Sequence, residues 1–115
     1  MRKLDTRKTH VKFADDETKS SFDRLKAGKY EDTQLYEFIN RAMDDLKENP
    51  FIGIKLPAKL WPREYVLRHR INNLWKYDLP NGWRLIYFLR GDDVEIVSII
   101  LEWFDHKNYE RRFGY

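Results

Sequence analysis

The last eleven residues of the chain bring together side chains that can move protons and hold negative charge. A histidine, a lysine, a tyrosine and two arginines fall within seven positions: His106, Lys107, Tyr109, Arg111 and Arg112. Cleavage of RNA without a metal needs a base for the 2′-hydroxyl proton, cations for the charge on the phosphate, and an acid for the leaving oxygen. Histidine titrates near neutral pH and fits either proton role, and cations supply electrostatic stabilisation. A charged tail that only keeps the protein soluble is the alternative interpretation.

A second group of polar residues lies where half-buried strands are expected. Alternation within residues 83–90 puts Arg84 on a face with apolar side chains, which is costly unless the guanidinium meets an anion or a carboxylate. A turn signal at 80–82 joins this segment to a preceding one that carries Lys76 and Asp78 on one face. We therefore expect Lys76 and Arg84 to lie close together. Arg84 then meets either a bound anion or an acidic side chain, which is Asp78 or one from a helix.

The first half of the chain predicts two helices that would support these segments. Either aspartate at 15–16 suits the N-cap of the first helix, which Gly28 ends. Asp32 or Thr33 begins the second, whose apolar residues recur at helical spacing until Asn49–Pro50.

The remaining segments favour β-structure and loops. We expect a strand at Lys8–Phe13, segments rich in β-formers at Tyr65–Ile71 and Leu74–Leu79, and strands at Trp83–Leu89 and Val94–Trp103. Residues 51–62 have the composition of a loop, and short turn signals at 80–82 and 90–93 make neighbouring strands antiparallel. The expected fold class is α+β, with the helices packed on one face of the sheet.

The composition indicates a single globular domain, residues 1–115, of which 42% are hydrophobic. The longest apolar run, near 96–101, is far shorter than the roughly 20 residues that a membrane span needs. The basic N-terminus lacks the apolar stretch of a signal peptide. The chain has no cysteine, which excludes disulfides, thiolate metal sites and cysteine nucleophiles. We expect a cytoplasmic protein without a membrane segment, a cofactor or a metal ion.

Positive charge is concentrated in the middle of the chain. Residues 55–90 carry eight Lys or Arg and only two acidic residues, although the net charge of the chain is +3. This distribution is typical of a positive face that holds a polyanion, and a plain solvated surface is the alternative. If the partner is RNA, we expect contacts from Lys55, Lys59, Arg68, Arg70, Arg90, Arg111 and Arg112.

Two stretches resemble a known family. The segments Leu74–Tyr87, which contains Trp83-Arg84-Leu85-Ile86-Tyr87, and His106–Phe113 are similar in type, order and spacing to motifs of the RelE/ParE superfamily of type II toxins. The likeness extends from the strand that contains Val11 to the tail, and so covers nearly the whole chain.

The resemblance implies two N-terminal helices packed on a four-stranded antiparallel sheet. For the RelE branch it also implies metal-free cleavage of mRNA in the ribosomal A site. The strand lysine then matches Lys76, the strand arginine Arg84, the terminal basic residue His106 or Lys107, and the aromatic Tyr109. Lys76 or His106 would act as the base, Arg84 would hold the phosphate, and Tyr109 would stack on a nucleobase. The implied partners are a cognate antitoxin, mRNA and the ribosome.

The chain departs from the family pattern at two places. Asp78 stands where a second lysine is common, so it either opposes an RNA phosphate or restrains Arg84. Residues 55–70 form an insert between the helices and the sheet that is longer than in compact members. ParE-like relatives keep the fold, lack the nuclease residues and bind DNA gyrase. The alternative function is therefore a non-catalytic binder, either a gyrase inhibitor or an inactive RNA-binding relative.

Overall fold

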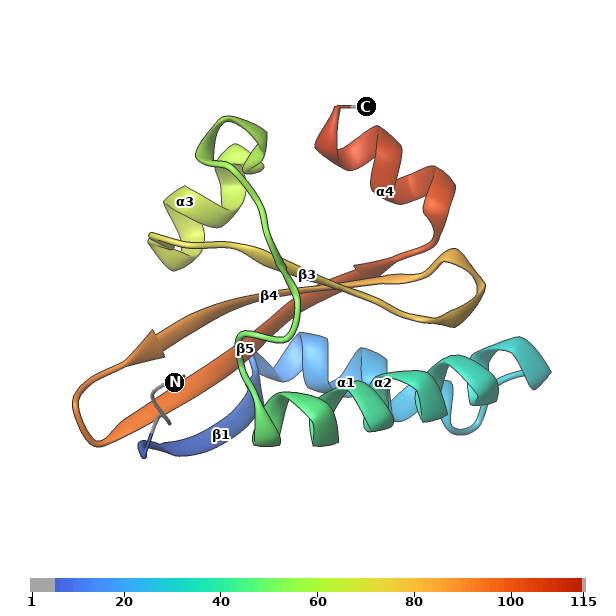
Figure 1. The fold of residues 1–115 in the computed structure, drawn as a ribbon. Coiled ribbons are helices and arrows are strands. Elements are labelled where there is room, and N and C mark those ends of the chain that lie inside the picture. The colour runs from blue at the N-terminus through green and yellow to red at the C-terminus, as the bar shows by residue number, and fades with distance from the viewer. Residues whose placement is uncertain (1–5, 115) are drawn as a thin grey trace.

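A computed structural model of the chain describes residues 6–114, so residues 1–5 and Tyr115 of the tail lie outside the described part. A five-stranded sheet forms the middle layer, and helices cover both of its faces (Figure 1). The strands are β1 (Lys8–Phe13), β2 (Ile54–Lys55), β3 (Trp75–Asp78), β4 (Arg84–Gly91) and β5 (Glu95–Phe104). The helices are α1 (Asp16–Leu25), α2 (Tyr30–Glu48), α3 (Arg63–His69) and α4 (His106–Phe113), and short 3-10 turns lie at Ala58–Leu60 and Pro80–Gly82.

The helix pair α1 and α2 covers one face of the sheet. Asp15 is the N-cap of α1, as the sequence indicates, because its Oδ1 accepts the backbone N–H of Thr18 at 2.8 Å. Helix α2 begins at Tyr30 and not at Asp32. The Asp32 carboxylate accepts the backbone N–H of Lys29 at 3.2 Å, so this residue belongs to the first turn and not to the cap.

The sheet is mixed and has five strands, which corrects the expected four antiparallel strands. The pairs β2–β3, β3–β4 and β4–β5 are antiparallel, as their short connections require. Strand β1 lies parallel to β5, from Lys8 opposite Glu95 to Phe13 opposite Ile100. The additional strand β2 lies inside the expected loop. Local turn signals do not specify which distant strand lies beside β1, so the sequence could not reveal the parallel pair.

Residues 65–71 form most of α3 and its end, although they are rich in β-forming residues. Pro62 precedes the helix, and Arg70 ends it in the left-handed conformation with a φ of 51°. Tyr65 is buried on the sheet, where its hydroxyl donates a hydrogen bond to Glu102. Packing against the sheet therefore outweighs the weak intrinsic preference of these residues for strands.

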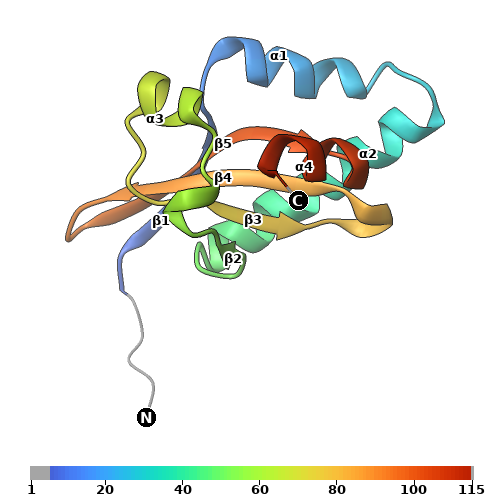
Figure 2. The same ribbon diagram turned by 90° about the horizontal axis from the view of Figure 1, so that it is seen from above.

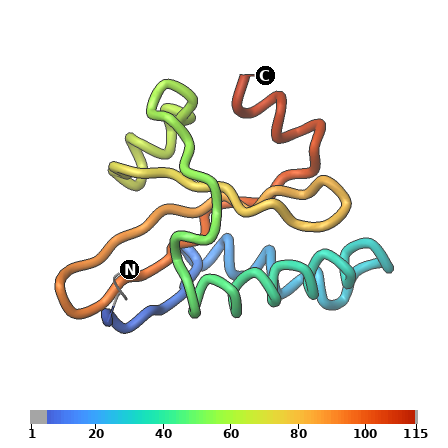
Figure 3. Tube along the Cα trace, viewed as in Figure 1, coloured from blue at the N-terminus to red at the C-terminus, as the bar shows by residue number. Residues whose placement is uncertain are grey.

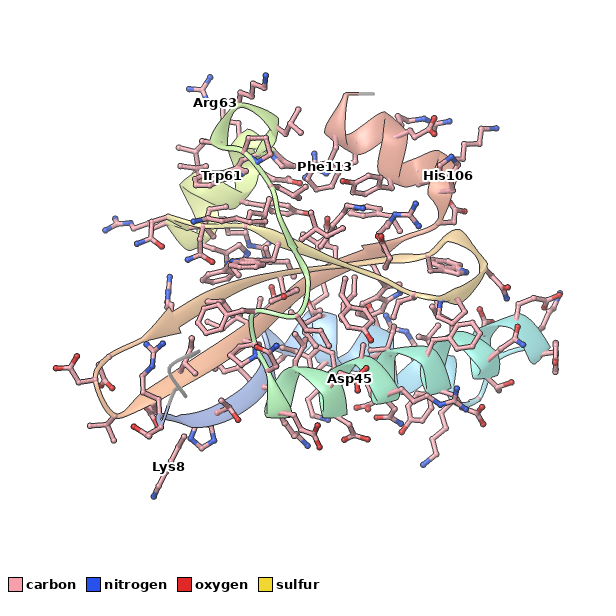
Figure 4. The ribbon with its side chains drawn as sticks, viewed as in Figure 1. Lys8, Asp45, Trp61, Arg63, His106 and Phe113 are labelled. Carbon is pink, nitrogen blue, oxygen red and sulfur yellow. The ribbon has the colours of Figure 1, made fainter. Side chains whose placement is uncertain are left out.

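The charged tail is also a helix, α4. Asp105 Oδ1 accepts the backbone N–H of Asn108 at 2.8 Å, and Gly114 ends the helix with a φ of 76°. Tyr109 and Phe113 lie one turn apart and are only 3% and 2% exposed. Seen from above, α4 lies over β4 and β5 (Figure 2), and Phe113 lies between α4 and α3 (Figure 4).

Each face of the sheet has its own hydrophobic core. Alternate residues of β4 point to opposite faces, so Leu85 and Tyr87 join the core under α1 and α2, whereas Ile86 and Phe88 join the core under α3 and α4. The second core also contains buried residues from outside β4: Leu56, Tyr65, Ile71, Leu74, Ile99, Leu101, Tyr109 and Phe113. Helices therefore cover both faces, and the expectation that they lie on one face only is wrong.

Because α4 supplies part of this core, we expect Phe113→Ala to lower the free energy of unfolding by about 3–5 kcal/mol. Lys107→Ala, on the exposed side of the same helix, should change it by no more than about 0.5 kcal/mol. Urea unfolding followed by circular dichroism measures both values. Equal stability of the two variants would show that α4 does not pack as described.

Candidate functional site

Lys76 of β3 and Arg84 of β4 lie close together and share one acidic partner. Asp78 lies opposite Arg84 in the antiparallel register, and Lys76 lies opposite Ile86. Asp78 Oδ1 is 2.9 Å from Lys76 Nζ and 3.0 Å from Arg84 Nε. The side chains of Lys76 and Arg84 are only 16% and 18% exposed. One carboxylate thus balances two partly buried cations, which leaves an excess of positive charge.

The ring of Tyr109 joins α4 to this pair. Lys76 Nζ lies 5.7 Å and Arg84 Cζ 5.6 Å from the centre of the ring, distances at which a cation is attracted to an aromatic face. Tyr109 is 3% exposed and stacks on Phe113 with ring centres 4.7 Å apart. The structure therefore places Tyr109 beneath the two cations and inside the core, and not on a surface where a nucleobase would stack.

His106 and Lys107 lie at the exposed start of α4. His106 Nε2 is 2.6 Å from Glu110 Oε1, and the histidine side chain is 63% exposed. A Cβ atom placed on Gly82 would lie 3.3 Å from His106 Cβ, so the start of α4 lies beside the turn that joins β3 to β4 (Figure 3). His106 lies at this start of the helix (Figure 4). Phe104, two residues before it, is opposite Arg84 in the register, which puts His106 at the same end of the sheet as the cation pair. The spacing of His106 and Glu110, one helical turn apart, is visible in the sequence and is the signal that would pair them on a helix.

The other predicted RNA contacts do not gather around this pair. Arg112 forms an ion pair with Glu64, and its guanidinium lies 5.3 Å from the centre of the Tyr65 ring. Burial lowers the pKa of Arg112. These interactions connect α4 to α3, and they leave the Arg112 guanidinium less available to bind RNA. Arg111, the neighbouring residue, is exposed.

Arg68 of α3 and Arg90 of β4 also have partners of their own. Arg90 Nη2 donates a 2.5 Å hydrogen bond to the His69 carbonyl oxygen, and Arg68 is 3.4 Å from Asp15 Oδ2. Burial, with a smaller contribution from Arg68, lowers the pKa of His69 and favours its neutral form. Three further predicted contacts are exposed: Lys55, Lys59 and Arg70.

Within residues 6–114, no group of three or more histidine or acidic side chains is placed to hold a metal ion. The side chains at the site are two cations with one acidic partner, and an exposed imidazole beside a carboxylate. Such a group can bind an anion and exchange a proton with it.

A model of the family described as the ParE toxin of the parDE type II toxin–antitoxin system matches residues 14–101. The chain belongs to this family. This confirms the resemblance to the RelE/ParE superfamily of type II toxins. No curated protein and no solved structure matches the chain. The matched segment contains Lys76 and Arg84 but ends before α4, so family membership does not by itself assign a role to His106 or Tyr109.

Membership also identifies one partner, because the toxin of a type II system is paired with an antitoxin. In the part of this toxin that the structure describes, no helix combines the length and the apolar character needed to cross a membrane.

Replacing the shared carboxylate of this toxin tests whether it restrains the two cations. We expect Asp78→Asn to bind heparin more tightly and to elute at higher salt, because Lys76 and Arg84 lose a counter-ion. The same change should lower the free energy of unfolding by about 1–3 kcal/mol, since two partly buried cations lose a charged partner. Asp44→Asn, on the exposed side of α2, changes the net charge equally and is the matched control. Identical elution of the two variants would contradict this role of Asp78.

Proposed function

We propose that this toxin is an endoribonuclease that cuts mRNA on the ribosome without a metal ion. The observation that supports this proposal is the convergence of Lys76, Arg84 and His106 from three elements, β3, β4 and α4, at one end of the sheet. Two cations with a single carboxylate between them retain the positive charge that a phosphodiester needs. The general base, the electrostatic stabiliser and the general acid of RNA cleavage are then all available from side chains.

The proposed roles follow from exposure and contacts. Arg84 and Lys76 bind the scissile phosphate, which displaces Asp78 from one or both cations. His106 is 63% exposed and is oriented by Glu110. Its neutral imidazole takes the proton of the attacking 2′-hydroxyl, and the imidazolium so formed returns a proton to the leaving 5′-oxygen. Lys107 supplies a further exposed cation at the same helix end. Tyr109 acts as a positioning residue, because its buried ring holds the two cations in place.

The wider RNA contact is proposed to use exposed basic side chains outside this group. The substrate is a single-stranded codon of mRNA within the ribosome, whose phosphates attract cations independently of sequence. The proposed contacts are Lys55, Lys59, Arg68, Arg70, Arg90, Arg111 and Arg112. Of these, Arg68 and Arg112 already hold acidic partners and would contribute less.

One observation favours a second candidate, a toxin that binds DNA gyrase or RNA without cleaving it. Asp78 engages both cations, and α3 and α4 close the sheet face on which RNA would lie. A toxin of this kind needs no proton transfer. Its growth inhibition would therefore survive the loss of His106.

Inducible expression without the antitoxin tests the nuclease proposal, with growth and mRNA 5′ ends as the measurements. We expect rapid growth arrest and cuts inside translated codons. Arg84→Ala and His106→Ala should each lower the cleavage rate about 100- to 10,000-fold, as the loss of a charge-stabilising or proton-transferring group does.

The matched controls carry the same substitutions at exposed positions far from the site. Arg41→Ala on α2 and His10→Ala on β1, whose histidine also lies beside a glutamate, should leave cleavage unchanged. Growth arrest with intact mRNA, retained in His106→Ala, would select the non-catalytic candidate. Normal growth of cells that express the unmodified toxin would contradict the nuclease proposal.

A further inference from the structure

An open cavity of about 710 Å³ lies where the end of the β4–β5 ladder meets α4. This volume falls within the range of small-molecule sites. The residues that line it are Trp83, Trp103, Phe104, Asp105, Asn108, Arg111 and Arg112. Neither the family match nor the proposed catalytic roles give this cavity a function.

The aromatic walls come from the last residues of the ladder. Trp103 lies opposite Leu85, and Phe104 lies opposite Arg84 in the antiparallel register. Trp103 is held on its other side by an edge-to-face contact with Phe22, with ring centres 6.5 Å apart. Trp83 and Trp103 are both only half-buried. They therefore offer indole surfaces on which a flat ring can stack, a contact that accepts any nucleobase.

The polar wall comes from α4 and can distinguish between bases. Asn108 and Arg111 are three residues apart, so they lie on the same side of the helix, and both are exposed. The Asp105 carboxylate accepts the backbone N–H of Asn108, which fixes the turn that presents the amide side chain. An amide pairs with N6 and N7 of adenine, and a guanidinium pairs with O6 and N7 of guanine. Both groups thus match purines, because pyrimidines lack N7.

The cavity lies at the same end of the sheet as Arg84. Phe104, which lines the cavity, is opposite Arg84 in the register, and Arg84 Nη1 donates a hydrogen bond to the carbonyl oxygen of Trp83 at 3.3 Å. The indoles of Trp83 and Trp103 pack against the core under α1 and α2, whereas the Arg84 guanidinium lies on the other face of the sheet, over Tyr109.

We propose that this cavity binds a purine base of single-stranded RNA. The choice of RNA over a free nucleotide rests on the proposed nuclease function. Trp83 and Trp103 stack on the base, and Asn108 and Arg111 select purines over pyrimidines.

The indole N–H signals of the tryptophans in a ¹H–¹⁵N correlation spectrum test this proposal on the unmodified protein. Titration with AMP should shift the signals of Trp83 and Trp103. Those of Trp61 and Trp75 are internal references, since their indole N–H groups donate to the Leu56 carbonyl oxygen and to Asn73 Oδ1. CMP carries the same phosphate charge and should bind about tenfold more weakly, because it lacks the purine edge. Equal affinity for AMP and CMP, or no shift at Trp83 and Trp103, would overturn the proposal.

A variant separates base recognition from binding of the phosphate. Asn108→Ala should lower the affinity for AMP about tenfold and leave the affinity for CMP unchanged. Asn72→Ala, at an exposed position before β3, is the matched control. An unchanged affinity of Asn108→Ala for AMP would remove the amide from base recognition and overturn the proposed selectivity.

A short RNA distinguishes the two sources of the purine. The trinucleotide ApApA should bind more tightly than AMP, because its second phosphate and its further bases can contact the exposed cations of α4 and the indole walls. Tighter binding of AMP would assign the cavity to a free nucleotide and overturn the RNA assignment. These binding results do not depend on cleavage. Purine selectivity together with intact mRNA in cells would support this site and contradict the nuclease proposal. Cleavage of mRNA without purine selectivity would support the nuclease proposal and contradict this site.

Discussion

The contact between the buried ring of Tyr109 and the cations of Lys76 and Arg84 is the interaction on which the site depends. The ring is part of the hydrophobic core under α3 and α4, and its face also contacts the two cations above it. Attraction between a cation and an aromatic face reaches about 2 kcal/mol when the pair is desolvated. The low exposure of the two cations therefore requires α4 to be folded onto the sheet. The same packing that stabilises the C-terminal helix also sets the direction of the basic side chains.

Asp78 stabilises both cations and still leaves the group with a net positive charge. A partly buried lysine or arginine without a counter-ion would be unfavourable, and one acidic residue for each cation would leave no charge for a ligand. One carboxylate between two cations holds both side chains in place and still leaves net positive charge. Pre-positioned charge of this kind lowers the reorganisation that binding of an anion requires. The acidic residue that departs from the family pattern is thus compatible with an anion site.

Local signals in the sequence were sufficient for the parts of the fold that neighbouring residues determine. The Asp15 cap, the periodicity of α2 and the turn at 80–82 were all visible, and the turn is the reason that Lys76 and Arg84 were expected to lie close together. The cap and end signals of α4, Asp105 and Gly114, were also present. The charged composition between them concealed the pair Tyr109 and Phe113, whose spacing predicts one buried helix face.

Other features depend on contacts between distant segments, which a single sequence does not specify. The helix that contains Tyr65 is stabilised by packing on the face of β4 and β5, and not by a helical preference of the neighbouring residues. The sequence leaves the partner of Arg84 open between a bound anion, Asp78 and an acidic residue of a helix, and the strand register places Asp78 opposite Arg84. The burial of Tyr109 likewise depends on the position of the whole helix.

The parallel pairing of β1 with β5 determines when the toxin can become complete during its synthesis. The first strand of the chain has its neighbour in the last strand, so it has no partner in the sheet until β5 has emerged from the ribosome. Contacts between such distant segments also slow folding, because a long loop must close before they form. Helix α4 follows β5 directly. A nascent chain whose β5 and α4 are still inside the ribosome therefore lacks both the pairing of β1 and the ring beneath its cations, so the basic surface is complete only after these two elements have emerged.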